Sequence, residues 1–301
     1  MNIRAIESKI VSIVLPTFNC AHFLSRAVQS VLDQTYIHWE LLIIDNYSID
    51  NTVDVVKIFQ DQRIRFLQIH NKGVIAKSRN LGIREAKGRW VAFLDADDWW
   101  CADKLDASVR ALLLGHDFVY HDLIRKGPSK CWIHGRFART RNLNTPIFDD
   151  LLFNGNGIIN SSVVVKRSLL MQIGYASEDP SLVAVEDYDY WLRIAKKTEK
   201  FFRLQKAYGY YWIDNNSVSR STNAFNYLNR IRDLYFTDLS SKLPVWYIFL
   251  VVQSYIREKN YKQALFELSK MTCVNAKYYH VLKYLILKSK IYFYLSRKRW
   301  H

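Results

Sequence analysis

The chain has little cysteine, proline and glycine, with four, five and ten of these residues among 301. The four cysteines are widely spaced and form no Cys-x-x-Cys pair: Cys20, Cys101, Cys131 and Cys273. This spacing argues against a disulfide framework or a structural zinc site and is typical of a reducing compartment. Because 50% of the residues are hydrophobic, the chain is neither disordered nor collagen-like and can bury a sizeable core.

Long apolar runs are also missing. The first ten residues contain Arg4, Glu7 and Lys9 and no apolar stretch, so no secretory signal is visible. The most apolar stretch, Val245–Val252, is far shorter than the roughly 18 residues that a membrane-spanning helix needs. We therefore expect a cytoplasmic protein, soluble or attached to a membrane surface.

Acidic residues are outnumbered, since 28 Asp and Glu face 43 Lys and Arg, a formal surplus of +15. Residues 221–301 hold fourteen of the basic and only four of the acidic side chains, and no acid follows Glu267. The same segment is crowded with Tyr, Trp and Phe. This change in composition predicts a boundary near residue 220, between a first domain at 1–220 and a basic, aromatic-rich helical region at 221–301.

Apolar runs alternate with helical patterns over the first 120 residues. Short apolar runs predict buried strands at residues 11–15 and 41–44, and a third and fourth strand are predicted at 65–70 and 90–94. Apolar residues at helical spacing predict helices at about 19–32, 52–59 and 75–86. Asn19 is a candidate N-cap of the first helix and Gly88 a candidate C-cap of the third. The alternation predicts an α/β fold, a mostly parallel sheet with helices on both faces.

Polar side chains gather where the predicted strands end, which is where such sheets bind ligands. These ends carry Pro16-Thr-Phe-Asn19, Asp45-Asn46 and Asp95-Ala-Asp-Asp98. No Gly-x-Gly-x-x-Gly follows the first strand and no P-loop occurs, which argues against both common phosphate loops. The aspartates instead suggest Mg²⁺ or Mn²⁺ bridging to a diphosphate, because these ions prefer oxygen ligands. An acidic turn at the start of a helix is the alternative.

Four sequence motifs resemble, in order, those of the family 2 glycosyltransferases, inverting enzymes of the GT-A fold. They are Ser12–Asn19, Glu40–Thr52, the block from Asn71-Lys-Gly73 to Asp98, and Val185–Arg193. The resemblance covers about residues 10–220. It implies a GT-A catalytic domain with a nucleotide-sugar half at about 10–122 and an acceptor half at about 123–220.

The resemblance also implies roles for single residues. It assigns nine residues to the nucleotide-sugar pocket: Pro16, Thr17, Asn19, Asp45, Asn46, Arg79, Asp95, Ala96 and Asp98. It assigns three to Mn²⁺ or Mg²⁺: Asp97, Asp95 and Asp214. Asn46 stands where many members have a second aspartate, and its amide can still pair with a pyrimidine edge. A surface arginine on a helix is the alternative for Arg79.

The implied reaction needs a base but no general acid. A metal ion stabilises the departing nucleoside diphosphate, whereas the incoming hydroxyl must lose a proton on the opposite face of the sugar. Asp187 is the expected base and Glu186 the expected acceptor contact, and repulsion between the two acids would raise the pKa of one of them. An ordinary acidic helix N-terminus is the alternative interpretation.

The resemblance implies a single transfer, because the Gln-x-x-Arg-Trp motif of processive synthases is absent. We expect a hexose, glucose or galactose, to move from a UDP-sugar to a saccharide linked to a polyprenyl diphosphate, in a β1,3 linkage. O-antigen or capsule assembly at the inner face of the bacterial inner membrane is the expected setting. The alternatives are an inactive GT-A-like assembly protein tethered to the membrane and a transferase for teichoic acid or protein.

The basic tail has two interpretations. Lys and Arg can bind the phosphates of an anionic membrane surface while Tyr and Trp lie at the headgroup level. Alternatively, the aromatic side chains pack a helical appendage. Nucleic acid is not expected as a partner, because nothing in the sequence resembles a nucleic-acid module. The sequence does not indicate an oligomeric state.

Overall fold

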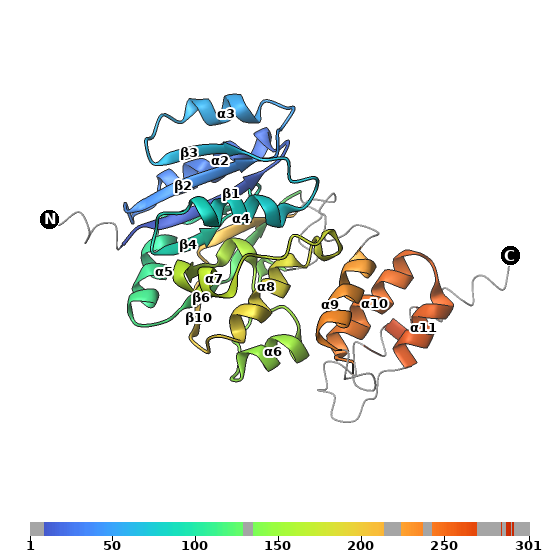
Figure 1. Ribbon diagram of the computed structural model, residues 1–301. Helices are drawn as coiled ribbons and strands as arrows, with labels where there is room; N and C mark the ends of the chain where they lie inside the picture. The colour runs from blue at the N-terminus through green and yellow to red at the C-terminus, as the bar shows by residue number, and fades with distance from the viewer. Residues whose placement is uncertain are drawn as a thin grey trace. The chain divides into compact units, whose positions relative to one another are not determined.

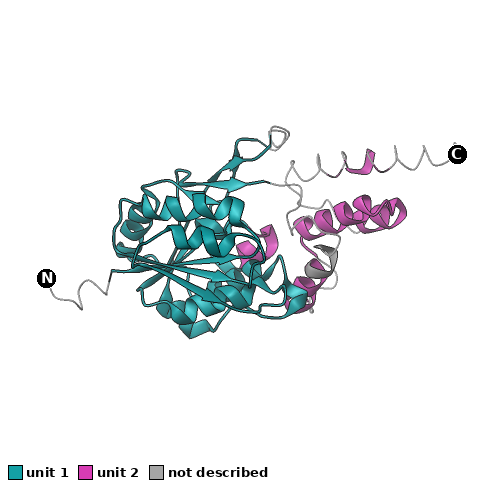
Figure 2. Cartoon of the chain, turned by 90° about the horizontal axis from the view of Figure 1, so that it is seen from above, with its two compact units in different colours: residues 1–148, 157–215 teal, residues 149–156, 216–301 magenta. Residues whose placement is uncertain are grey.

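The computed structural model describes residues 9–128, 135–213, 224–236, 243–269, 284, 287–289 and 291. The chain divides into two compact units, one of residues 1–148 and 157–215 and the other of residues 149–156 and 216–301 (Figure 2). Asp214, an expected metal ligand, lies outside the described residues. None of the helices in these ranges combines the length and the apolar character of a membrane-spanning helix.

A seven-stranded sheet forms the centre of the first unit, in the order β10-β6-β9-β4-β1-β2-β3 (Figure 1). Neighbouring strands run parallel except at β9, which is antiparallel to both β4 and β6. The predicted, mostly parallel sheet is thereby confirmed. Its strands are β1 (Val11–Thr17), β2 (Trp39–Asp45), β3 (Ile64–Gln68), β4 (Trp90–Phe93), β6 (Phe118–His121), β9 (Val164–Lys166) and β10 (Phe201–Leu204).

Helices cover both faces of this sheet. They are α2 (Ala21–Leu32), α3 (Thr52–Ile58), α4 (Ile75–Glu85), α5 (Lys104–Leu113), α7 (Arg167–Ile173) and α8 (Glu186–Ala195). Ile13 of β1 belongs to a buried core shared with α2, α3 and α5. The next residue, Val14, points to the other face and touches α4, where a Cβ on Gly82 would lie 2.4 Å from Val14 Cγ1. Trp191 of α8 packs against Phe93 on that same face, with ring centroids 5.9 Å apart.

A smaller, four-stranded sheet has the order β5-β11-β7-β8. Its strands are β5 (Trp99–Trp100), β7 (Leu123–Lys126), β8 (Phe137–Ala138) and β11 (Gly209–Trp212). Strand β5 follows the loop after β4, and β7 follows β6, so this sheet continues from the carboxyl ends of the main sheet. The 3₁₀ turn η2 (Asn160–Ser162) lies directly before β9. A second 3₁₀ turn, η3 (Pro180–Leu182), lies before α8.

The second unit is helical in its described part. It contains α9 (Ala224–Tyr235), α10 (Val245–Arg257), α11 (Tyr261–Ser269) and most of α6 (Ile147–Asn154). The most apolar run of the sequence lies in α10, where Tyr247 and Phe249 are buried in a core shared with α11. Trp246 Nε1 donates to the carbonyl oxygen of Leu152 in α6, at 2.9 Å. Part of the aromatic content of the tail therefore serves packing within this unit.

The prediction that Asn19 caps the first helix is wrong. Asn19 adopts a left-handed backbone with φ of 47°, and its Oδ1 accepts a hydrogen bond from the backbone N–H of Ile49 at 2.9 Å. The backbone N–H groups at the start of α2 donate instead to side chains in the loop after β2 and at the start of α3. Asp50 Oδ2 accepts from Ala21 N at 3.0 Å, and Thr52 Oγ1 accepts from Cys20 N at 3.3 Å.

Gly88 was expected to close α4, and this prediction is also wrong. The helix ends before Ala86, whose backbone is extended. Gly88 is instead needed for a close approach of two segments, because a Cβ at this position would lie 2.6 Å from the carbonyl oxygen of Ile10. Its N–H donates to Ser12 Oγ at 2.8 Å. Gly88 therefore holds the entry to β4 against the start of β1.

We predict that Gly88→Ala lowers the free energy of unfolding by about 2 kcal/mol, because the added methyl group would overlap backbone atoms. Thermal denaturation measures the effect. Lys87→Ala changes the exposed neighbouring side chain and should alter stability by no more than about 0.5 kcal/mol. Equal melting temperatures for the two variants would contradict the close approach described here.

Candidate active site

Three carboxylates lie in one turn after β4. Asp95 and Asp97 are half-buried, whereas Asp98 is only 1% exposed. The turn is closed by the N–H of Asp98, which donates to the carbonyl oxygen of Asp95 at 3.0 Å. Asp98 Oδ1 accepts from the N–H of Trp212 in β11 at 2.9 Å. Burial raises the pKa of the Asp98 carboxyl well above its ordinary value, and the charges of Asp97 and Asp95 raise it further.

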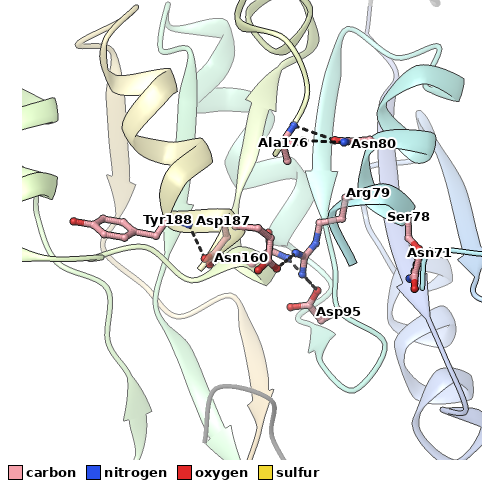
Figure 3. Close-up of polar contacts among 10 residues, drawn as sticks. Asn71, Ser78, Arg79, Asn80, Asp95, Asn160, Ala176, Asp187 and Tyr188 are labelled. Atoms are coloured by element: carbon pink, nitrogen blue, oxygen red, sulfur yellow. Dashed lines mark hydrogen bonds and ion pairs between the residues drawn. The ribbon is translucent and has the colours of Figure 1, made fainter. Parts of the chain in front are cut away.

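A buried arginine joins this turn to α8. Arg79 of α4 is 7% exposed, and its Nη2 donates to Asp95 Oδ1 at 2.8 Å while its Nη1 donates to Glu186 Oε1 at 2.6 Å. Figure 3 shows the Arg79 side chain reaching toward Asp95 and the start of α8. Burial alone would lower the pKa of the guanidinium, but Asp95 and Glu186 raise it above its ordinary value. The surface-arginine interpretation of Arg79 is therefore wrong.

Asp187 follows Glu186 in the first turn of α8 and is held differently. Its Oδ1 accepts from the N–H of Tyr188 at 2.6 Å (Figure 3). Burial raises the pKa of Asp187 to about 7, with a further contribution from the charge of Glu186 and an opposing one from Arg79. The first turn of α8 thus carries Glu186, which is paired with arginine, next to Asp187, whose pKa is raised to about 7.

These acids line a cavity of about 360 Å³. Its walls come from the smaller sheet, from α4, from the turn after β4 and from the segments around η2 and the start of α8, which lie far apart in the sequence. They are formed by Arg79, Asp95, Arg125, Ala138, Arg139, Ile158, Ile159, Asn160, Ala184, Glu186, Asp187 and Tyr211. The cavity therefore brings three of the predicted acids and Arg79 together, and it adds two further arginines.

Asn160 and Ser161 are site residues that the sequence did not reveal. Asn160 Nδ2 donates to Asp95 Oδ1 at 3.0 Å, and Ser161 Oγ accepts from the N–H of Asp95 at 3.1 Å. Both residues lie in η2, next to the antiparallel strand β9. No motif marks them, and the only signal is a polar Asn-Ser-Ser tripeptide between apolar residues.

The predicted nucleotide residues lie at the ends of β1, β2 and β4. The register pairs Thr17 with Asp45, and the N–H of Asn46 donates to the carbonyl oxygen of Thr17 at 3.0 Å. Asp45 is fully buried and accepts hydrogen bonds from Ser48 and Gln68. Asn46 Oδ1 accepts from the N–H of Asn71 at 2.8 Å. These polar groups therefore fix the loops at this edge of the sheet.

The other predicted pocket residues are placed as follows. Pro16 lies in β1, and Ala96 is 6% exposed in the turn after β4. Asn19 donates its N–H to Ser48 Oγ at 2.8 Å and thereby joins the loops after β1 and β2. None of these three lines the cavity that contains Asp187. Their contacts with a nucleotide stay predictions.

Arg26 of α2 contacts the backbone of the acidic turn. Its Nη2 donates to the carbonyl oxygen of Asp97 at 3.0 Å. Its guanidinium carbon lies 3.5 Å from the ring centroid of Trp99 and 5.0 Å from that of Trp212. This cation between aromatic rings fixes the backbone that carries Asp97.

The residues fit a divalent cation that is shared with a diphosphate. In the described part of the chain, no group of three or more His, Cys, Asp or Glu side chains is placed to hold an ion by itself. Mg²⁺ and similar ions are commonly bound through one or two carboxylates and substrate phosphates. The turn of Asp95, Asp97 and Asp98 supplies such carboxylates, and a cation would offset the negative charge that these three side chains concentrate there.

The mostly parallel sheet with helices on both faces is the arrangement of the GT-A fold. Residues 12–174 match the family model described as Glycosyl transferase family 2, and the chain belongs to this family. Among solved structures, S. aureus TarS 1-349 in complex with UDP-GlcNAc has a TM-score of 0.59 at 16% identity, covering 94% of this chain and 80% of that chain. Mannosyltransferase PcManGT from Pyrobaculum calidifontis, in complex with GDP-Man and Mn²⁺, has a TM-score of 0.56 at 17% identity, covering 97% and 82%. These similarities confirm the GT-A fold.

Curated relatives are bacterial glycosyltransferases. The Escherichia coli UDP-Glc:alpha-D-GlcNAc-diphosphoundecaprenol beta-1,3-glucosyltransferase WfgD is 36% identical over 193 residues, which are 63% of this chain and 71% of that protein. The putative teichuronic acid biosynthesis glycosyltransferase TuaG of Bacillus subtilis is 30% identical, covering 70% of this chain and 81% of that protein. The chain is therefore a glycosyltransferase of the family 2 type.

We predict that Arg79→Met lowers the free energy of unfolding by about 3 kcal/mol, because it leaves Asp95 and Glu186 in a protein interior without their cation. Chemical denaturation measures this loss. Arg84→Met on the exposed face of the same helix is the matched control and should cost less than about 1 kcal/mol. If the two substitutions cost the same, Arg79 does not stabilise the site.

Proposed function

We propose that the protein transfers glucose from UDP-glucose, with inversion, to a GlcNAc residue linked to a polyprenyl diphosphate, forming a β1,3 linkage. The observation that carries the proposal is the cavity in which Asp187 and Asp95 share a wall, in a chain of this family. The donor, acceptor and linkage are supported by the names of WfgD and WfaP, two relatives at 36% and 30% identity. Galactose is the second candidate for the transferred sugar.

Asp187 acts as the base in this proposal. Its carboxylate takes the proton of the acceptor hydroxyl, whose oxygen bonds to C1 of the donor sugar as the bond from C1 to the diphosphate oxygen breaks. The electron pair of that bond leaves with UDP, so a single displacement inverts C1. A pKa of about 7 allows Asp187 to accept the proton near neutral pH. Glu186, held by Arg79, contacts the acceptor sugar beside it.

Asp97 and Asp95 would hold Mn²⁺ or Mg²⁺ in the proposed enzyme. The ion, when bound, stabilises the negative charge of the departing diphosphate. Asp95 Oδ1 already accepts from Arg79 and Asn160, so its second oxygen is the one left for the ion or the ribose. In this proposal the nucleoside is bound by Asp45, Asn46, Thr17 and the neighbouring loop.

Attachment to the inner face of the bacterial inner membrane completes the proposal. The acceptor is membrane-linked, and the surplus of positive charge in residues 221–301 would attract anionic lipids. A second candidate function keeps the chemistry and changes the acceptor to a teichuronic or teichoic acid precursor. The similarity to TuaG favours this candidate.

We predict that Asp97→Ala and Asp187→Asn each lower the rate of glucose transfer at least about 100-fold, because one removes the metal ligand and the other the base. The assay combines UDP-glucose, Mn²⁺ and a synthetic GlcNAc-diphosphate lipid and detects the disaccharide product by mass spectrometry. Asp54→Asn on the exposed face of α3 is the control and should retain the wild-type rate. Full activity of both site variants would refute the assigned roles.

We further predict that kcat/KM falls about tenfold per pH unit below pH 7, because protonation of Asp187 removes the base. Since the charge of Glu186 helps to raise the pKa of Asp187, Glu186→Gln should move this acidic limb to lower pH. The measurement is a pH profile of transfer at saturating Mn²⁺. An acidic limb that stays in place in Glu186→Gln would show that another group is titrating.

A further inference from the structure

Asn80, the residue after Arg79 in α4, is fully buried and bonds to the loop that follows α7. Its Oδ1 accepts from the N–H of Ala176 at 3.0 Å, and its Nδ2 donates to the carbonyl oxygen of the same residue at 2.9 Å (Figure 3). The same Nδ2 donates to Glu178 Oε1 at 2.9 Å. Because a side-chain amide both donates and accepts, Asn80 satisfies both backbone polar groups of Ala176 and fixes this part of the loop to α4.

The same loop is also bound to α8. The hydroxyl of Tyr190 donates to the carbonyl oxygen of Gly174 at 3.1 Å, and Arg193 Nη2 donates to the carbonyl oxygen of Tyr175 at 2.8 Å. Both donors lie in α8, whereas Asn80 lies in α4. The loop residues 174–176, which we call the bridge, therefore join α4 to α8.

Helix α8 is thus held to α4 at two separate points. In its first turn, Glu186 accepts directly from Arg79 at 2.6 Å. Further along the helix, Tyr190 is connected to Asn80 through the bridge. Since a helix rises about 6 Å over four residues, the two points fix the direction of α8 as well as its place. The position of Asp187, which follows Glu186, therefore depends on both.

Side-chain packing leaves a gap beside Asp187. A cavity of about 10 Å³ is lined by residues of α4, β4 and α8, together with Ala176 of the bridge. This volume is about that of one water-sized probe. Ala176 and Asp187 both line this small space, so a displacement of the bridge would change the surroundings of Asp187 directly.

We propose that Asn80 is a positioning residue, which holds the base Asp187 in place through the bridge. The inference rests on the proposed function, because that function makes Asp187 the base. In group transfer, a misplacement of about 1 Å can cost about 100-fold in rate. Loss of the Asn80 contacts should therefore slow the transfer step. The nucleotide pocket proposed at the ends of β1 and β2 contains no bridge residue and should bind UDP-glucose as before.

The test replaces Asn80 by alanine and measures transfer from UDP-glucose to the GlcNAc-diphosphate lipid. The enzyme is counted as UDP-binding sites, by calorimetry with Mn²⁺, so that unfolded protein does not enter the rate. For Asn80→Ala we expect kcat per site to fall about 10- to 100-fold and the KM of UDP-glucose to change less than about twofold. Glu178→Gln is the matched control and should behave as wild type, because its amide oxygen can still accept from Asn80 Nδ2.

A second variant keeps the test valid if Asn80→Ala folds poorly. Tyr190→Phe removes only the hydroxyl that bonds to Gly174, at the other end of the bridge, and keeps the aromatic ring. It should lower kcat per site about threefold or more, with the KM of UDP-glucose again within about twofold of wild type.

Three outcomes would overturn the proposal. If the substitutions lower only the number of UDP-binding sites, Asn80 serves the stability of the fold and not the base. If they raise the KM of UDP-glucose at constant kcat per site, Asn80 serves the donor pocket. If Asn80→Ala slows transfer and Tyr190→Phe does not, Asn80 acts through its neighbour Arg79 and not through the bridge.

Amide hydrogen exchange keeps this inference separate from the proposed function, because it requires no transfer. In both Asn80→Ala and Tyr190→Phe, the amides of α8 should exchange at least about tenfold faster than in wild type, whereas those of α2 should not change. Glu178→Gln should exchange as wild type does. If α8 responds in this way but wild type transfers no glucose, the proposed reaction fails and the hold of the bridge on α8 stands. Unchanged exchange of α8 in both variants overturns the inference, whether or not transfer occurs.

Discussion

The pairing of Arg79 with Asp95 and Glu186 is the interaction on which the arrangement of the site depends. The two carboxylates lie 16 and 107 residues from Arg79 in the chain, so one guanidinium joins α4, the turn after β4 and the start of α8. Each acid would be costly to bury alone, and the planar fork of arginine can satisfy both at once. Because Glu186 and Asp187 are adjacent, fixing the first also fixes the backbone that carries the second.

This pairing explains why neighbouring acids behave differently. Among the described residues, Arg79 donates directly to Glu186, whereas Asp187 accepts from the N–H of Tyr188. Burial and the charge of Glu186 therefore outweigh the opposing charge of Arg79, and the pKa of Asp187 rises to about 7. Two adjacent carboxyl groups in a single helical turn can thus have different surroundings, because the guanidinium of Arg79 donates to Glu186 and the N–H of Tyr188 donates to Asp187.

The sequence predicted the elements whose stability is local and missed those decided by distant partners. Strands β1, β2 and β4 contain apolar runs because both faces of the sheet are covered, and such runs are visible in the sequence. Strand β9 has only three residues and is stabilised by pairing with β4 and β6, so the local sequence does not predict it. Residue type alone predicts Asn19 and Gly88 at helix ends, yet their actual contacts are with Ile49 and Ile10, which are distant in sequence. Asn160 was not predicted as a site residue for the same reason, because its contact is with Asp95, 65 residues away in the sequence.

The net charge of a sequence cannot show which arginines are available to a ligand, because individual arginines have different contacts in the folded chain. Arg79 is buried between carboxylates, and Arg26 lies over the ring of Trp99 and holds the carbonyl oxygen of Asp97. Arg139 is exposed on a cavity wall. The first two are committed to the protein, since their donors meet groups of the site itself. The net charge therefore gives the excess of basic over acidic side chains. The contacts of each guanidinium decide whether that side chain can also bind a ligand.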